Sequence, residues 1–249
     1  MIEGSLYNAP KNLLKDKVVL VTGGGSGIGR QAGLTFTAFG AEVILLGKNS
    51  SNLNETYSLF EKNNLKKPIL QAIDFEIAEE EDFKKISEEV LKEFGKLDGL
   101  LNNASILGTK TSIQNYDINE WRRVSKINFE SSLLLTRSLL PVLQIPDNSS
   151  IVFTSSGVGR KGKAYWGAYA ISKFATEGLV QILSEELEKT SGIRVNAINP
   201  GAVRTKMRAQ AYPAEDPKTL KNPKDIMNAY LFLMGIDSLG ITGKSIEAQ

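Results

Sequence analysis

The sequence predicts a protein of the α/β class, with a doubly wound parallel sheet of seven strands flanked by helices on both faces, in three layers. Three observations predict this fold. Short apolar segments recur along the chain, helical segments with one apolar face lie between them, and a glycine cluster follows the first apolar segment. Strands that alternate with helices favour right-handed crossovers, which produce a parallel sheet covered on both faces.

The expected strands are short, and the first two consist only of apolar residues, as is typical of strands buried on both faces. The first strand ends at the glycine cluster. In chain order, the expected strands are 18–21, 43–46, 69–73, 97–101, 151–154, 193–198 and a short last one near Ser245 and Ile246.

Helical periodicity is clearest in two segments, 79–94 and 171–187. The acidic run that begins the first one is expected in the first turn, where carboxylates meet the positive end of the helix dipole. In each segment the apolar residues recur on one face, which is expected to pack on the sheet. These residues are Phe83, Ile86, Val90, Leu91 and Phe94 in the first segment and Ile171, Phe174, Ala175, Ile182, Leu183 and Leu187 in the second.

The chain is expected to form one domain, since no linker divides it. Residues 1–16 are mixed and polar and are expected to form an arm over the surface, followed by a single domain over 17–249. The segment near 202–223 is rich in Lys, Arg, Ala and Pro and lacks a clear period. We expect it to be an insertion over the carboxyl edge of the sheet, where ligands bind in open α/β folds.

Composition excludes several kinds of chemistry. The 249 residues include no histidine and no cysteine, so a Ser-His-Asp triad and a metal site built on His or Cys are both excluded. Thirty basic and 28 acidic residues give a formal charge of +2 without a long basic block, and no nucleic-acid partner is predicted. No apolar stretch is long enough for a membrane span or a signal peptide, so we expect a cytoplasmic protein without a membrane partner.

The glycine cluster predicts a dinucleotide site. The pattern is Gly23-x3-Gly27-x-Gly29, placed between the first strand and a helix. One glycine permits the tight turn, a second lets the backbone approach a pyrophosphate, and a third lets the helix pack close to the strand. Amides at the start of the helix then bind phosphate. A glycine-rich loop without a ligand is the alternative, but the position after a strand favours a Rossmann-like cofactor turn that includes Ser26 and Ile28.

Further motifs make the chain resemble the short-chain dehydrogenase/reductase family. They occur in the family's order from residue 17 to about 247, and the ordered set is far more specific than any one motif. The motifs are Asn102-Asn103-Ala104-Ser105, Asn128, Ser156 thirteen residues before Tyr169, the Tyr169-x-x-x-Lys173 spacing, Pro200-Gly201 followed by Thr205, and Ile241-Thr242-Gly243. Within the family, the stretches 153–156 and 166–178 and the segment Glu215-Asp216-Pro217 resemble the bacterial YciK-type oxidoreductases.

The resemblance implies a hydride transfer between a nicotinamide and a carbonyl or alcohol substrate. Tyr169 is then the general acid and base. Lys173, one helical turn later, presents an ammonium that is expected to lower the pKa of the phenol from its usual value near 10. By resemblance, Lys173 also binds the nicotinamide ribose, Ser156 holds the substrate oxygen, and Asn128 holds a water that links Lys173 to solvent.

Each of these residues also has an ordinary interpretation. Ser155 and Ser156 could both be simple strand-end hydroxyls, and Ser155 competes for the catalytic role. Asn128 could be a buried helix residue satisfied by backbone groups. Ser105 departs from the family motif, which has glycine there, and we expect a local backbone adjustment at this position.

The expected cofactor is NADP(H). NAD-specific sites usually place an acidic residue after the second strand, whereas this chain has Gly47 followed by Lys48 and Asn49. An ammonium there can pair with the 2′-phosphate, while NAD(H) is the less favoured alternative. By resemblance, Asp74 binds the adenine. The remaining expected cofactor contacts are Phe75, Asn103, Pro200, Gly201, Val203 and Thr205, together with Tyr169 and Lys173.

Alternative functions remain open. Within enzymes, a 3-oxoacyl-thioester reductase is possible if Lys206 and Arg208 face an acidic carrier or a phosphate. From another class comes a binding protein that senses NADP(H) without turnover, against which the intact set of Ser156, Tyr169 and Lys173 argues. The partners are a small carbonyl or alcohol substrate and further copies of the chain. Apolar positions on helices 120–140 and 171–187 exceed what one sheet face can cover and favour a homodimer or homotetramer.

Overall fold

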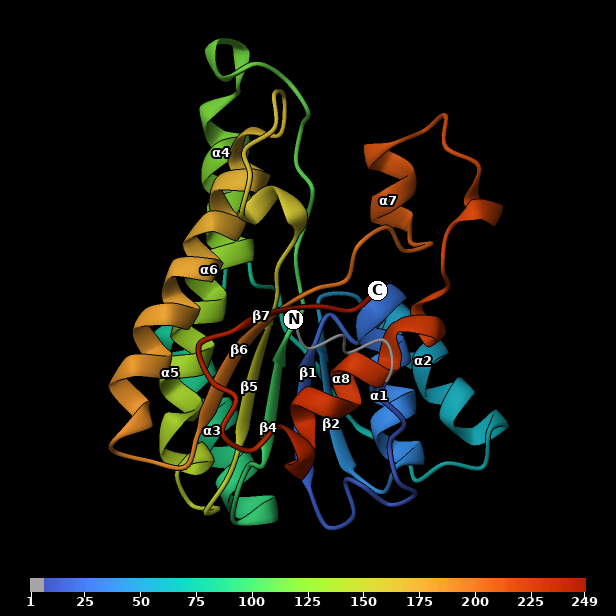
Figure 1. Ribbon diagram of the computed structural model, residues 1–249, viewed down its shortest axis with the longest axis vertical. Coiled ribbons are helices and arrows are strands. Elements are labelled where there is room, and N and C mark those ends of the chain that lie inside the picture. The colour runs from blue at the N-terminus through green and yellow to red at the C-terminus, as the bar shows by residue number, and fades with distance from the viewer. Residues whose placement is uncertain (1–6) are drawn as a thin grey trace.

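The computed structural model describes residues 7–249, which fold around one central sheet (Figure 1). The sheet has seven parallel strands in the order β3-β2-β1-β4-β5-β6-β7. This confirms the predicted doubly wound sheet. The strands are β1 Val18–Thr22, β2 Glu42–Gly47, β3 Ile69–Ala72, β4 Gly99–Asn102, β5 Ser150–Thr154, β6 Arg194–Asn199 and β7 Ser245–Glu247. The strand order reverses between β1 and β4, and a crevice opens at the carboxyl ends of the strands at such a point.

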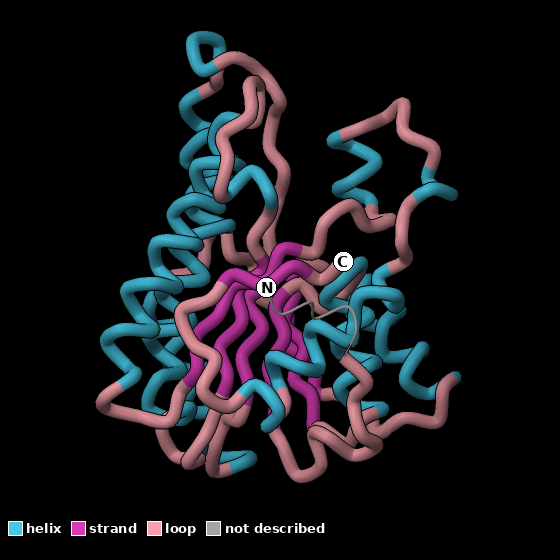
Figure 2. Tube along the Cα trace, viewed as in Figure 1, coloured by secondary structure: helices cyan, strands magenta, loops and turns pink. Residues whose placement is uncertain are grey.

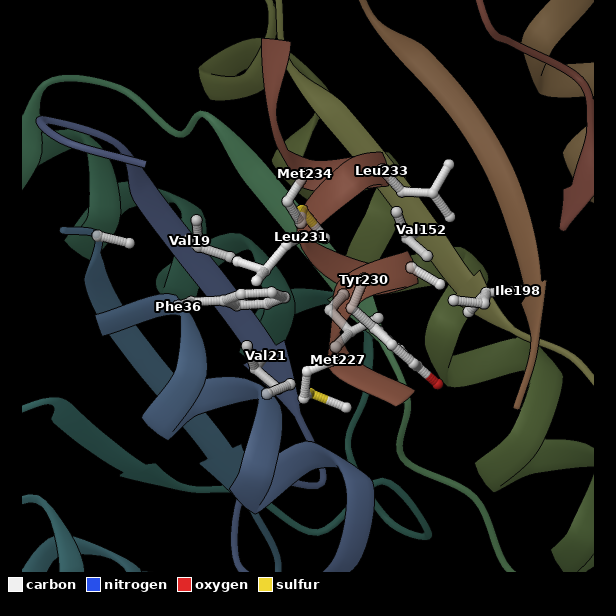
Figure 3. Packing of buried hydrophobic residues seen from close by; sticks show 14 of the residues in the cluster. Val19, Val21, Phe36, Val152, Ile198, Met227, Tyr230, Leu231, Leu233 and Met234 are labelled. Carbon is white, nitrogen blue, oxygen red and sulfur yellow. The ribbon is translucent and has the colours of Figure 1, made fainter. Parts of the chain in front are cut away.

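Helices cover both faces of the sheet, which gives the three predicted layers (Figures 1 and 2). One face packs against α1 Gly27–Ala38, α2 Ser50–Lys62 and α8 Met227–Met234. Figure 3 shows Phe36 of α1 beside Val19 of β1 and Leu231 of α8 in this core. The other face packs against α3 Glu80–Phe94, α5 Ser131–Leu143 and α6 Gly167–Glu188, and α4 Ile118–Ser125 packs against α6. None of the helices in residues 7–249 is both long and apolar enough to cross a membrane.

The start of α3 follows the sequence prediction, but part of its expected apolar face does not. Glu79 and Asp82 form a capping box at its first turn, where their charge also suits the helix dipole. Phe83, Ile86 and Val90 are buried against the sheet, whereas Leu91 is exposed. Leu91 was therefore wrongly assigned to the packed face.

The prediction for α6 was wrong in its start and in part of its face, whereas Leu183 and Leu187 are buried as expected. The helix begins at Gly167, four residues earlier than expected. Ile171, Phe174 and Ile182 are exposed, because the side that meets the sheet carries Tyr169, Lys173, Val180, Leu183 and Leu187. The covered side of α6 carries the polar residues Tyr169 and Lys173. A prediction based on apolar periodicity alone therefore placed some exposed residues on the packed face.

The segment 202–223 lies beyond the carboxyl ends of the strands. It contains the short helix α7, Lys206–Ala211, which stands apart from the main body in Figure 1. A bridge between Val203 and Lys221 joins the two ends of the segment. At the amino-terminal end of the chain, residues 7–16 run over the surface, and Tyr7 packs edge-on against Phe232 of α8. The remainder of the expected arm lies outside the described residues.

Candidate active site

A cavity of about 450 Å³ opens at the carboxyl ends of the central strands. Its walls come from the glycine cluster after β1, the loop after β4, the end of β5, the start of α6 and the segment 200–211. Residues far apart in the sequence meet here because parallel strands bring their carboxyl ends to one edge.

The glycine cluster forms a tight cradle between β1 and α1. Gly23 and Gly27 have left-handed backbones, with φ of 71° and 54°, which other residues adopt only at a cost. A Cβ on Gly29 would lie 2.4 Å from the carbonyl oxygen of Gly23. Ser26 precedes α1 without capping it through its side chain, so the first-turn amides face outward as an anion site requires. The cradle fits the pyrophosphate of a dinucleotide.

The loop after β4 is fixed to β1 by one hydroxyl. Thr22 Oγ1 accepts hydrogen bonds from the amides of Asn103, at 2.8 Å, and Ala104, at 2.9 Å. Thr154 of β5 donates to Asn103 Oδ1 at 3.3 Å. Ser105 is not among the described residues with a left-handed backbone. Ser105 therefore needs no left-handed backbone here, and the local adjustment expected for the missing glycine stays a prediction.

Tyr169 lies at the floor of the cavity, in the first turn of α6. Its side chain is buried, and the Ser156 side chain lies close to its hydroxyl. Burial raises the pKa of Tyr169 to about 12, although Ser156 acts in the opposite direction. The expectation that a neighbouring ammonium lowers this pKa was wrong, because desolvation outweighs the other influences on the phenol.

Lys173 lies one turn further along α6 and is only 3% exposed. Its Nζ donates to the carbonyl of Thr154 at 2.8 Å and lies 5.6 Å from the centre of the Tyr169 ring. Burial lowers the pKa of Lys173 to about 8, and the charge of Glu177 opposes that shift. The lysine therefore titrates close to neutral pH.

The two consecutive serines point to different partners. The Ser155 hydroxyl donates to the buried carboxylate of Glu177, and its amide donates to Ile198 at 2.7 Å. Ser156 lies on the cavity wall beside the Tyr169 hydroxyl. Of the two, only Ser156 has a hydroxyl placed next to the phenol.

Asn128 lies in a π-helical turn, Lys126–Glu130, between α4 and α5. Its Oδ1 accepts from the amide of Ile106 at 2.8 Å, and its Nδ2 donates to the Ile106 carbonyl at 2.9 Å and to Ser172 at 3.1 Å. Single π turns occur frequently at functional sites. The side chain thereby fixes the loop after β4 against α6, which is the ordinary interpretation considered for it, and its predicted role in holding a water stays a prediction.

A second, smaller cavity of about 180 Å³ lies at the ends of β2 and β3. Lys48 borders it, with Nζ 2.8 Å from Asp74 and 3.2 Å from Glu76. These two carboxylates raise the pKa of Lys48. Asn49 caps α2 by accepting from the Asn52 amide at 3.0 Å. Arg123 of α4 reaches the same network through Glu76.

Apolar side chains close the outer part of the main cavity. Leu107, Trp166 and Met207 contribute to its wall. Lys110 lies 5.0 Å from the centre of the Trp166 ring and donates to the Ala211 carbonyl at 2.7 Å. Through this cation–π contact Lys110 joins the loop after β4 to the loop after β5, and through its hydrogen bond to Ala211 it joins them to the segment after β6.

Most of the predicted cofactor residues line one of the two cavities. Gly29 and Asn49 line neither cavity, and their predicted cofactor contacts stay predictions. The main cavity includes Gly23, Ser26, Gly27, Ile28, Asn103, Tyr169, Lys173, Pro200, Gly201, Val203 and Thr205, and the smaller one includes Gly23, Lys48, Asp74 and Phe75. Sequence reasoning missed lining residues that belong to no motif, among them Arg30, Asn52, Glu55 and Arg123. Within the described part of the chain, no cluster of acidic side chains could hold a metal ion.

The fold and this site define a nucleotide-dependent oxidoreductase, and comparison with known proteins agrees. Residues 17–216 match the family model for short chain dehydrogenases, so the chain belongs to that family. It is 43% identical to the uncharacterized oxidoreductase YciK of Escherichia coli over 243 residues, which cover 98% of this chain and 96% of that protein. The predicted resemblance to YciK-type oxidoreductases is thereby confirmed.

Solved structures of similar proteins share the whole fold. A putative short chain dehydrogenase from Pseudomonas syringae is 47% identical, with a TM-score of 0.96 over 98% of both chains. One from Shigella flexneri, solved in complex with NADP, is 44% identical, with a TM-score of 0.93 over 96% of this chain and 100% of the other. One from Escherichia coli CFT073, in complex with NADPH, is 45% identical with the same TM-score and coverage.

We predict that Gly29→Ala destabilises the protein by about 1–3 kcal/mol, the range seen for overpacked sites. The new methyl group would collide with the backbone oxygen of Gly23. Gly178→Ala is the matched control, since it also lies in a helix but meets nothing within 4 Å. It should be neutral or stabilise by up to about 1 kcal/mol. Urea unfolding measures both; equal effects would show that the cradle tolerates a side chain.

Proposed function

We propose that the protein is an NADP(H)-dependent oxidoreductase that interconverts a carbonyl compound and its alcohol. The observation that carries this proposal is the placement of Ser156, Tyr169 and Lys173 together on the floor of a cavity that also contains the glycine cradle. The bound nicotinamide would supply or accept the hydride. Lys173 is positioned to hold the ribose, and Ser156 to bind the substrate oxygen.

The protonation states favour the reductive direction. With a pKa raised to about 12, Tyr169 retains its proton at neutral pH. It can therefore donate from its hydroxyl to the carbonyl oxygen as the carbon accepts the hydride, which gives the neutral alcohol. Oxidation requires the reverse proton transfer to a phenolate, which burial disfavours.

The walls of the cavity favour a substrate with an apolar body. Leu107 and Met207 offer no hydrogen-bond donor to a sugar chain, and Trp166 offers only its indole N–H. The NADPH-dependent aldehyde reductase 1 of Arabidopsis thaliana, 32% identical over 90% of this chain, supports aldehydes as the first substrates to test. The glucose and ribitol dehydrogenase of Daucus carota, also 32% identical, makes sugars the comparison set.

The two alternatives have less support. Arg208 forms an ion pair with Glu215, and its guanidinium lies 4.0 Å from the centre of the Tyr212 ring. Of the two basic residues considered for the acidic carrier of a 3-oxoacyl-thioester reductase, Lys206 is therefore the one left to bind it. A sensor without turnover would not need a proton donor beside a substrate pocket.

We predict that Tyr169→Phe lowers kcat with NADPH and an active aldehyde by at least about a hundredfold, as expected for loss of general acid catalysis. NADPH affinity should be unchanged because only the hydroxyl is removed. Ser156→Ala should cost more activity than Ser155→Ala. Steady-state kinetics and calorimetry measure these effects. Near-normal turnover by Tyr169→Phe would refute the assigned mechanism, and NADPH binding without turnover of any carbonyl by the wild type would favour the sensor.

We predict a preference for NADPH over NADH that depends on Lys48. The ammonium is 60% exposed at the end of β2, where a 2′-phosphate would compete with Asp74 and Glu76 for it. A charge-assisted bond of about 1.5–3 kcal/mol corresponds to roughly tenfold to a hundredfold in affinity. Calorimetric titration of both cofactors should show this loss of preference in Lys48→Ala. Lys66→Ala, another exposed lysine paired with an acid, is the control. An unchanged preference in Lys48→Ala would exclude it as the phosphate contact.

We propose further that the protein forms a homodimer or homotetramer through the outward face of α6. Ile171, Phe174 and Ile182 are all exposed there, and a contiguous apolar face of this kind is typical of an interface. Light scattering at micromolar concentration should give an oligomer for the wild type and a smaller particle for Phe174→Glu. Ile77→Glu, at an exposed residue after β3, should change nothing. A monomeric wild type would exclude the proposal.

A further inference from the structure

Glu177 is a buried carboxylate that the proposed mechanism does not use. It lies on α6 one turn after Lys173 and two turns after Tyr169, and it is 8% exposed. Glutamate is almost never this buried without partners. Its position beneath the catalytic lysine therefore needs a physical reason.

Three groups hold the Glu177 carboxylate. Its Oε1 accepts from the hydroxyls of Ser155 and Ser245, the latter at 2.9 Å, and lies 3.6 Å from Nε of Arg160. Ser155 directly follows β5, Ser245 begins β7, and Arg160 lies in the turn after β5. Together they fix the carboxylate at the inner end of the active site.

The end of β5 and the start of α6 meet residue by residue. The Thr154 carbonyl holds Nζ of Lys173, the Ser155 hydroxyl holds Glu177, and the Ser156 hydroxyl meets Tyr169. Three consecutive residues at and just after the end of β5 thus contact three successive turns of the helix, although not in the same order. Ser155 therefore differs from Ser156 in its contact: the Ser155 hydroxyl orients the Glu177 carboxylate.

The Lys173 ammonium needs a compensating negative charge. Its direct partner is a neutral carbonyl, and a buried ammonium without an opposite charge tends to lose its proton. Glu177, on the same helix, supplies the charge that opposes this loss. The other charged groups around it are Arg160, from the turn after β5, and Glu247 of β7, which binds Arg160. Arg160 also forms an ion pair with Glu247. Its positive charge therefore neutralises the charge of Glu177 only in part.

We propose that Glu177 is a positioning residue that keeps Lys173 in its ammonium form beneath Tyr169. It touches neither substrate nor cofactor and acts through the lysine alone. The inference rests on the proposed function, since it assigns a part to Glu177 in that same site. Its direct consequence, the charge state of Lys173, is measurable without turnover.

The test is the titration of Lys173 in the full-length protein. With ¹³C-labelled lysine, the Cε resonance that is lost in Lys173→Met identifies Lys173. In Glu177→Gln the amide keeps the size and hydrogen bonds of the side chain but lacks the charge. The ammonium is then less favoured, so Lys173 loses its proton at a pH lower by about one unit or more. The alkaline limb of kcat/KM for aldehyde reduction should move down by the same amount.

Two controls separate charge from packing. Glu177→Asp restores the charge and should return the Lys173 titration most of the way to that of the wild type. Ser245→Ala removes one hydrogen bond to the carboxylate and should leave the titration in place. An unchanged Lys173 titration in folded Glu177→Gln overturns the proposal, as does an equal shift in Ser245→Ala.

A second variant keeps the proposal testable if Glu177→Gln does not fold. Arg160 is partly exposed, and Arg160→Met leaves Lys173 as the main cation near Glu177. The Lys173 titration should then move to higher pH, and a downward shift would overturn the proposal. If the wild type shows the expected titrations but reduces no carbonyl compound, the proposed function fails while the role of Glu177 stands.

Discussion

The hydrogen bonds of one buried hydroxyl, that of Thr22, join the parts of the molecule that form the site. Thr22 ends β1 immediately before the glycine cradle, and its Oγ1 accepts the first two amides of the loop after β4. Asn103 of that loop returns a bond to the Thr22 carbonyl and accepts one from Thr154 at the end of β5. Since Thr154 also holds Lys173, the cofactor cradle and the catalytic helix are fixed relative to each other through three adjacent strand ends. Hydrogen bonds that link in this way restrict how the loop after β4 and α6 can lie relative to β1.

The fold was predictable because the signals that define it are local. Each apolar strand and the glycine cluster consist of a few consecutive residues. The alternation of such strands with helices along the chain predicts a parallel sheet. The side of a helix that packs on the sheet was less predictable. On α6 the covered side carries Tyr169 and Lys173, while Ile171 and Phe174 face outward, so polarity was inverted relative to the usual pattern. An apolar stripe on a helix predicts that this face is buried. It does not show whether the sheet or another surface buries it.

The motif residues of the site could be predicted, whereas their electrostatics could not. A spacing of four residues shows that Tyr169 and Lys173 share a face, but it does not show that both are buried. Desolvation shifts the pKa of a side chain by an amount that depends on how deeply the side chain is buried. The residues that bury Tyr169 and Lys173 come from segments far away in the sequence. Lys48 illustrates the same limit. Its pairing with Asp74 follows from the register of β2 and β3, in which Gly47 stands beside Ala72, and the sequence shows that register only once the strands are placed.

Burial acts on the side chains of Tyr169 and Lys173 in opposite senses. It holds the proton on Tyr169 and loosens the proton on Lys173, whose pKa falls from 10.5 to about 8. Holding the lysine charged at neutral pH costs about 3 kcal/mol, since each pKa unit corresponds to about 1.4 kcal/mol. The unfolded chain binds that proton more tightly, so the cost is greatest below pH 8 and fades as the pH rises toward 10.5. A charge retained at such a cost in stability is typical of a functional group rather than a structural one, and it explains why a second buried charge, that of Glu177, lies one turn away.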